Sequence, residues 1–172
     1  MQSAGKKLRI ISNALELGDK HVICRKLLSM KETTIKTEQQ FNCKPSRLWK
    51  AITNVEEMRQ WFFDNIPDFK AEVGFETKFM VDAGERQFMH LWKIIEVIPE
   101  KLIKYEWCYE GYKGTGYVTF RIDKNDHKTF LTLTNEGLES FHPKVPEFTR
   151  ENCTMGWRYF INDRLKDYIA KL

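Results

Sequence analysis

The sequence lacks the features that mark membrane-spanning proteins, disulfide-rich secreted proteins and the common metalloproteins. No run approaches the roughly 18 consecutive apolar residues of a transmembrane helix. The four cysteines are scattered without a C-x-x-C pair, and nothing at the N-terminus resembles a secretory signal. There is no H-E-x-x-H motif and no carboxylate cluster. We therefore expect a soluble, cytoplasmic protein with reduced thiols, no metal and no cofactor.

Excess charge is also lacking over most of the chain. Residues 1–29 hold six basic and two acidic side chains, which accounts for the whole formal net charge of +4. Residues 30–172 therefore hold 22 groups of each sign and are neutral. A nucleic-acid-binding domain needs a basic patch that neutralises phosphates. The balance argues against nucleic acid as a partner of residues 30–172.

Residues 1–29 form a basic extension whose structure the pattern leaves open. Its apolar residues could form two short amphipathic helices, interrupted at Gly18-Asp19. The alternatives are a helix that docks on a membrane surface or a partner, a weak targeting peptide, a loosely attached segment, or a stretch upstream of a true start at Met30. We place the domain boundary between residues 29 and 30.

From residue 30 onward, the spacing of apolar residues predicts one strand, two short helices, six strands and one long helix. The strands are expected over 33–41 and near 68–73, 76–82, 87–98, 102–109, 115–123 and 128–136, and the short helices over 44–54 and 56–61. The last helix has an apolar stripe at spacings of three and four, formed by Cys153, Trp157, Phe160, Ile161, Leu165, Tyr168, Ile169 and Leu172. So long a stripe must lie on an apolar surface, and the concave side of one antiparallel sheet is the expected partner.

Four strings occur in an informative order. They are LWKAIT (48–53) with Trp61 eight residues later, VIPEKLI (97–103) followed by Tyr105-Glu106-Trp107, LTLTNEG (131–137), and Gly156-Trp157. Together they resemble the bacterial activator of heat-shock protein 90 ATPase homologue-like family, within the START-like (SRPBCC) helix-grip superfamily that includes the birch-pollen allergen. The resemblance covers about residues 33 to 170.

The resemblance implies an α+β helix-grip fold with a cavity. Its parts are a curved antiparallel sheet of about six or seven strands, two short helices after the first strand, and a long C-terminal helix across the concave face. The superfamily's activities range from ligand carriage to cyclisation, so the resemblance does not choose among them. In the eukaryotic co-chaperone, a separate N-terminal domain supplies much of the ATPase stimulation, and residues 1–29 are far too short to be that domain.

Alternation along the strands predicts which side chains face the cavity. For the strand near 87–98 both faces are apolar, and Lys93 on the opposite face selects Phe88, His90 and Trp92 as inward; a one-residue bulge would reverse this choice. The candidate ligand-binding residues are rings and apolar groups of the inward faces and of the helix: Phe79, His90, Trp92, Tyr105, Trp107, Tyr109, Phe120, Leu133, Trp157 and Phe160. A solid core built from the same rings is the alternative.

Candidate catalytic groups are few. His90 lies on a predicted strand, where a core histidine is the alternative to a ligand contact. His142 and Cys153 could form a Cys-His dyad, but His142 lies in a predicted loop, so the sequence does not determine the distance between the two side chains. Gly111 to Gly116 invites a phosphate-loop interpretation; it joins two strands instead of opening a helix, so a hairpin is expected. We assign no catalytic residue.

Three function classes remain. The favoured one is a protein that encloses a small hydrophobic or aromatic ligand between sheet and helix. The second is a chaperone-interacting module that uses its outer surface, and the third is a cyclase or hydrolase-type enzyme that uses the same cavity.

The domain boundary generates a first prediction. Removing residues 1–29 should leave a protein that unfolds in one cooperative transition, because the strands and the C-terminal stripe already complete one core. Urea unfolding followed by fluorescence and circular dichroism checks this, and a molten or insoluble truncated protein would show that the boundary is wrong.

Overall fold

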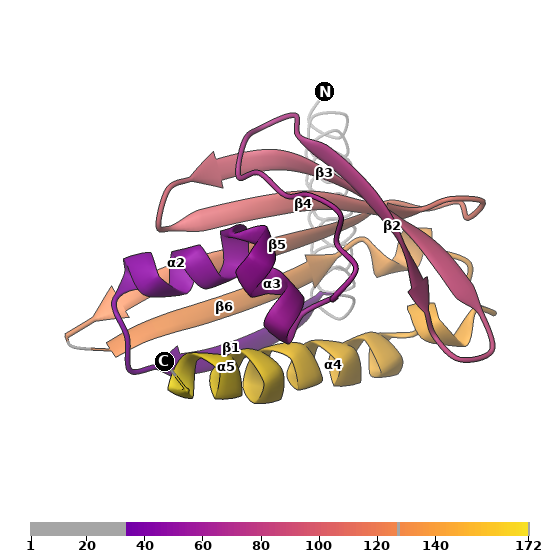
Figure 1. The fold of residues 1–172 in the computed structure, drawn as a ribbon. Helices are drawn as coiled ribbons and strands as arrows, with labels where there is room; N and C mark the ends of the chain where they lie inside the picture. Colours follow the sequence, from indigo (N-terminus) through magenta and orange to yellow (C-terminus); the bar gives the residue numbers. More distant parts are fainter. Residues whose placement is uncertain (1–33, 127, 172) are drawn as a thin grey trace, which may run out of the picture. The chain divides into compact units, whose positions relative to one another are not determined.

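The computed structural model describes residues 34–126 and 128–171, which form a single antiparallel sheet with helices over one of its faces (Figure 1). Its six strands are β1 (Ile35–Phe41), β2 (Glu76–Asp82), β3 (Gln87–Ile98), β4 (Leu102–Tyr109), β5 (Gly116–Asn125) and β6 (Lys128–Glu136), in the spatial order β1-β6-β5-β4-β3-β2. This confirms the predicted helix-grip sheet in its six-stranded form. The predicted extension (1–29) and Leu172 lie outside the described residues.

Two short helices, α2 (Pro45–Thr53) and α3 (Val55–Trp61), follow β1 as predicted. Asn54 separates them because its backbone is extended, and its side-chain oxygen accepts a hydrogen bond from the Glu57 amide at 3.1 Å, which caps α3. The indole of Trp61 is fully buried and donates to the Ala51 carbonyl at 2.9 Å. These two bonds fix the angle at which the second helix leads the chain back over the sheet.

The C-terminal helix consists of α4 (Arg150–Arg158), a π-helical stretch η3 (Tyr159–Leu165) and α5 (Lys166–Ala170). It runs beside β1 in front of the sheet (Figure 1), where Asn162 donates to the Glu38 carbonyl of β1 at 2.9 Å. Trp157, Ile161 and Leu165 of the predicted stripe are buried. The apolar stripe therefore faces the sheet, as its spacing predicts.

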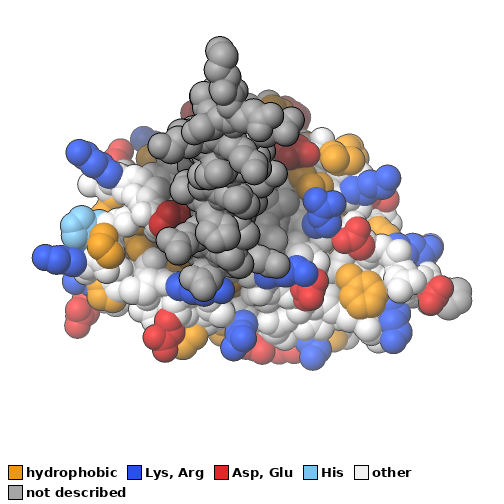
Figure 2. Space-filling view, turned by 180° about the vertical axis from the view of Figure 1, so that it is seen from behind, with side chains coloured by type: hydrophobic (Ala, Val, Ile, Leu, Met, Phe, Trp, Pro, Cys, Tyr) orange, Lys and Arg blue, Asp and Glu red, His pale blue; other side chains and the backbone are white. Residues whose placement is uncertain are grey.

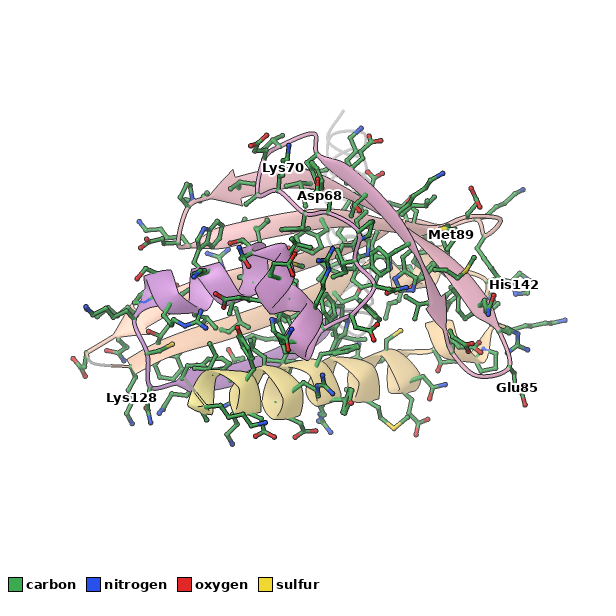
Figure 3. The ribbon with its side chains drawn as sticks, in the orientation of Figure 1. Asp68, Lys70, Glu85, Met89, Lys128 and His142 are labelled. Atoms are coloured by element: carbon green, nitrogen blue, oxygen red, sulfur yellow. The ribbon has the colours of Figure 1, made fainter. Side chains whose placement is uncertain are left out.

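The strand predicted near residues 68–73 is wrong. This part of the chain runs irregularly between α3 and β2, where Figure 3 marks Asp68 and Lys70. Arg59 donates to the carbonyls of Ile66 and Pro67 at 2.8 and 3.0 Å, so a guanidinium group holds this connection in place of a strand ladder. The apolar pattern arises because Phe69 is buried in the core.

The strand faces follow the predicted alternation. On β3, Phe88, His90 and Trp92 are buried, and the register shift lies between Ile94 and Glu96, beyond these three residues. The bulge therefore does not reverse the inward face.

The opposite face of the sheet is polar. Lys104, Thr119, Arg121, Thr132, Thr134 and Glu136 lie side by side there. Figure 2 shows this face from behind, where Lys and Arg side chains are interspersed with Asp and Glu. That residues 30–172 do not bind nucleic acid stays a prediction. None of the helices within the described ranges is long and apolar enough to cross a bilayer.

A left-handed glycine after β6 generates a stability prediction. Gly137 has a φ of 80°, and an added Cβ would lie 2.5 Å from the Thr115 carbonyl oxygen. Gly137→Ala should lower the free energy of unfolding by about 2 kcal/mol, since left-handed backbone alone costs an L-residue about 1–2 kcal/mol.

Gly156→Ala is the control for that variant. Its added Cβ meets no heavy atom within 4 Å, so the change should raise stability by up to about 1 kcal/mol through helix propensity. Urea unfolding of both variants gives the two values. Equal effects would contradict the conformational argument.

Candidate ligand-binding site

A hollow of about 270 Å³ lies between the sheet and the first part of the C-terminal helix. Strands β2 to β6 supply one wall, α4 and η3 supply the opposite wall, and the connection from β6 to α4 forms one end. Trp107 from β4 and Trp157 from α4 both line it and contact each other edge to face, with ring centroids 5.6 Å apart. We call this hollow the ring cavity.

The structure divides the ten sequence-predicted ligand-binding residues into two groups. His90, Trp107, Tyr109, Trp157 and Phe160 line the ring cavity. The other five lie outside the lining and pack in the solid part of the core: Phe79, Trp92, Tyr105, Phe120 and Leu133. The interior therefore contains both a hollow and a packed core. Ligand contact by the lining residues stays a prediction.

Sequence reasoning missed three lining rings, Phe63, Phe141 and Phe148. Phe141 and Phe148 come from the β6–α4 connection, which contains the 3-10 turns η1 (Leu138–Ser140) and η2 (Pro146–Phe148) and has no periodicity to read. Phe148 stacks on Tyr109 at 4.6 Å.

A weak signal for Phe141 existed in the β4–β5 hairpin. An added Cβ at Gly114 would lie 2.5 Å from the Phe141 ring, and one at Gly116 would lie 3.3 Å from it. Two glycines facing the same way in a hairpin are typical of close approach by another group. Two of the three glycines that suggested a phosphate loop, Gly114 and Gly116, thus make room for an aromatic ring, whereas an added Cβ at Gly111 would meet nothing within 4 Å.

An ion pair joins the two loops at one end of the ring cavity. Arg86, in the β2–β3 hairpin, donates through Nη1 to both carboxylate oxygens of Glu147, in η2, at 2.9 and 3.3 Å. Figure 3 marks Glu85 of this hairpin and His142 of the β6–α4 connection at the same end of the sheet. A hydrogen bond from its own backbone amide, and then the Arg86 guanidinium, hold the pKa of Glu147 below its usual value. The charged residue of the lining therefore already has its counter-ion.

His90 packs among four aromatic rings at the edge of the ring cavity. Its imidazole is 5% exposed, and the rings of Phe63, Phe79, Trp107 and Tyr109 lie 4.9 to 5.4 Å from it. Burial lowers the pKa of His90 from 6.5 to about 3, so the imidazole is neutral at pH 7.

Two polar atoms of the lining make no hydrogen bond of normal geometry with the protein. They are Nδ1 of His90 and Nε1 of Trp107, both shielded from solvent, although the Trp107 indole lies near enough to the Tyr109 hydroxyl to oppose the rise in the pKa of Tyr109. Leaving a buried polar group unpaired costs about 1–3 kcal/mol. Thr37, Trp92 and Tyr105 carry further atoms of this kind away from the lining.

The remaining polar groups of the lining are poor nucleophiles. Burial raises the pKa of the Cys153 thiol to about 11, and its Sγ donates to the Glu147 carbonyl at 3.3 Å. Burial also raises the pKa of Tyr109, against a smaller opposing effect of the nearby Trp107 indole. His142 is exposed and accepts a hydrogen bond from the Lys144 amide at 3.2 Å, so the structure does not bring it into a dyad with Cys153. Within residues 34–126 and 128–171, no three His, Cys, Asp or Glu residues gather as metal ligands.

Comparison with known proteins identifies a family. The family model described as "Activator of Hsp90 ATPase homolog 1-like protein" matches residues 42–170. No curated protein matches the chain.

Solved structures share the fold. Protein CV1439 from Chromobacterium violaceum is 19% identical, with a TM-score of 0.66 over 80% of this chain and 97% of that one. The Aha1 dimer from Colwellia psychrerythraea is 19% identical, with a TM-score of 0.61 over 79% of this chain and 95% of that one. DynU16, from the dynemicin biosynthetic locus, is 20% identical, with a TM-score of 0.64 over 80% of this chain; the match spans 47% of DynU16, about half its length.

The burial of His90 generates a pH prediction. Its folded pKa of about 3 lies below the ordinary 6.5, so between these values the unfolded chain binds a proton that the folded chain does not. Stability should therefore fall as the pH drops from 6.5 toward 3, by up to about 1.4 kcal/mol per pH unit from this group.

His90→Phe, which keeps a ring of similar size, removes this contribution. The carboxylates titrate alike in the wild type and in the variant. The difference between the two proteins in how the free energy of unfolding changes with pH therefore gives the contribution of the His90 imidazole. Urea unfolding at pH 6.5 and 4.5 should show the wild type losing about 2 kcal/mol more than the variant. Parallel losses would mean that His90 is hydrated or paired.

Proposed function

We propose that this chain, which belongs to the activator of Hsp90 ATPase homologue 1-like family, binds a small aromatic or apolar molecule in the ring cavity. One observation carries the proposal: a ring-walled hollow lies beside an interior that is otherwise filled. Its volume of about 270 Å³ is close to the lower end of the roughly 300–1,000 Å³ of ligand sites, which suits a compact ligand.

The composition of the walls supports an aromatic ligand. Trp107, Trp157 and Phe148 come from a strand, a helix and a loop, so ring faces and edges meet the hollow from three directions. Aromatic groups prefer offset or edge-to-face contacts with one another at centroid distances of 4.5–7 Å. The lining includes the exposed residues Ala83 and Asn152, so the hollow opens toward solvent and a small molecule could enter it.

The enzyme alternative has weaker support. A covalent mechanism needs an activated nucleophile next to a base. In this lining Cys153 stays protonated at neutral pH, and His90, with a pKa of about 3, is a weak base. Binding without covalent chemistry needs neither group to ionise.

The chaperone alternative rests on the family and on the outer surface. Five large apolar side chains of the described part are exposed: Val73, Met80, Ile98, Met155 and Tyr159. Met80 and Tyr159 share a surface hollow with Arg59 and Arg164, beside α3 and β2. A hydrophobic partner could dock there. However, the other three exposed residues, Val73, Ile98 and Met155, lie outside this hollow, so the five do not form one continuous apolar patch.

A cavity-filling variant tests the proposal. Gly156 lies in the lining, and an added Cβ meets nothing within 4 Å, so Gly156→Leu should fill the hollow while the helix stays intact. The wild type should bind N-phenyl-1-naphthylamine with increased probe fluorescence and a raised melting temperature. Gly156→Leu should lose at least about 90% of both effects.

Met155→Leu is the matched control, because residue 155 is the neighbour on α4 and its side chain is 55% exposed. It should bind the probe like the wild type. Equal binding by all three proteins would place the probe elsewhere on the surface. A wild type that binds neither this probe nor naphthalene would overturn the proposal, and the chaperone alternative would then move to first place.

A further inference from the structure

The two unpartnered polar atoms of the ring cavity lie on neighbouring strands. His90 on β3 and Trp107 on β4 both point inward, and their ring centroids are 5.1 Å apart. His90 is 5% and Trp107 6% exposed, so solvent reaches neither ring freely. Nδ1 of the imidazole and Nε1 of the indole thus form a small polar spot in a lining that is mostly aromatic and apolar, with Asn135, Asn152 and Glu147 as further polar side chains.

The charges around this spot exclude a charged ligand. The groups packed against His90 are the rings of Phe63, Phe79, Trp107 and Tyr109, and none of them is ionised at neutral pH. The lining contains one charged residue, Glu147, which Arg86 already pairs. A carboxylate or ammonium group placed beside His90 would lose its hydration without gaining a counter-ion.

The chemistry of the two atoms specifies what a ligand must offer. A neutral imidazole has one donor and one acceptor nitrogen, whereas an indole N–H only donates. A hydroxyl group both donates and accepts, so it can pair with either imidazole tautomer, and its oxygen or a carbonyl oxygen can also accept from Trp107. A site built to bond a hydroxyl group discriminates against an analogue that lacks it, because the polar groups of the site then stay unpaired.

We propose that the ligand of the ring cavity is an uncharged aromatic compound whose hydroxyl or carbonyl oxygen forms hydrogen bonds with His90 and Trp107. This inference rests on the proposed function and adds to it the polar group that orients the ligand. His90 and Trp107 are specificity-determining residues in this account, and the surrounding rings supply most of the contact area.

Three probes of one ring system test the inference: naphthalene, 2-naphthol and 2-naphthoate. Each is titrated in competition with N-phenyl-1-naphthylamine at pH 7. Transfer from water into a purely apolar site favours naphthalene, because the hydroxyl group of 2-naphthol must lose its hydration. The inference predicts the opposite order, with 2-naphthol at least about tenfold tighter than naphthalene, which corresponds to about 1.4 kcal/mol, and with 2-naphthoate weakest.

His90→Phe then locates the preference. It keeps a ring and removes the nitrogens, so it should bind naphthalene as well as the wild type does but lose the preference for 2-naphthol. Thr37→Val is the matched control, because Thr37 on β1 also carries a buried hydroxyl oxygen without a partner, away from the lining. It should keep the wild-type order. Melting temperatures establish that each variant is folded.

A second measurement uses the wild type alone. With ¹⁵N-labelled histidine, binding of 2-naphthol should shift the His90 ring nitrogens in the direction of a new hydrogen bond, and naphthalene should not. Equal affinity for naphthalene and 2-naphthol, or a preference that survives in His90→Phe, would overturn the inference while the proposed function stands. Binding of neither compound by the wild type would overturn the proposed function, and the inference with it.

Discussion

The packing of Phe62 against other rings is the interaction on which the interior depends. This residue follows α3 directly, and its ring contacts seven others, from α3, the sheet and the C-terminal helix: Trp61, Phe63, Trp92, Trp107, Phe120, Trp157 and Phe160. A curved sheet and one straight helix leave a wide gap between them, and large rings can fill it. Phe62 is buried in the part of the gap that side chains fill. The next residue, Phe63, lines the ring cavity, so the filled part ends there.

On the other side of Phe63, aromatic rings line the ring cavity instead of filling the space. Phe88, Phe141 and Phe148 form a second cluster, separate from the main core, and the ring cavity lies between the two. Because burial removes its hydration, the imidazole of His90 stays neutral among these walls. The same burial that makes His90 a poor base would make it a selective hydrogen-bonding group in the proposed binding role, since an unmet bond is costly only where water is excluded. Both properties support the proposed binding role over acid–base chemistry.

Local pattern was enough for most of the fold and for placing half of the candidate residues in the lining of the ring cavity. Period-two alternation placed His90 and Trp107 on the inner face, and the spacing of three and four placed Trp157 and Phe160 on the helix face that meets them. Alternation could not distinguish Tyr105 from Trp107, because both share one strand face and only the position along the sheet decides which one meets the hollow. Phe141 and Phe148 escaped prediction because tertiary contacts, not periodicity, fix the loop that carries them. The predicted strand at 68–73 failed for the same kind of reason, since tertiary contacts hold this connection: Arg59 binds the carbonyls of Ile66 and Pro67 just before it, and Phe69 is buried in the core.

The central claim is that the interior is solid around Phe62 and hollow beside Trp107 and Trp157. Diffraction from a crystal under xenon pressure tests this most directly, because xenon enters apolar cavities and is visible in electron density. If the interior is packed in this way, xenon will bind among Trp107, Trp157 and Phe148, and none will bind among Trp61, Phe62 and Trp92. A xenon-free interior in which the rings of Phe63 and Phe160 have closed over the hollow would contradict it.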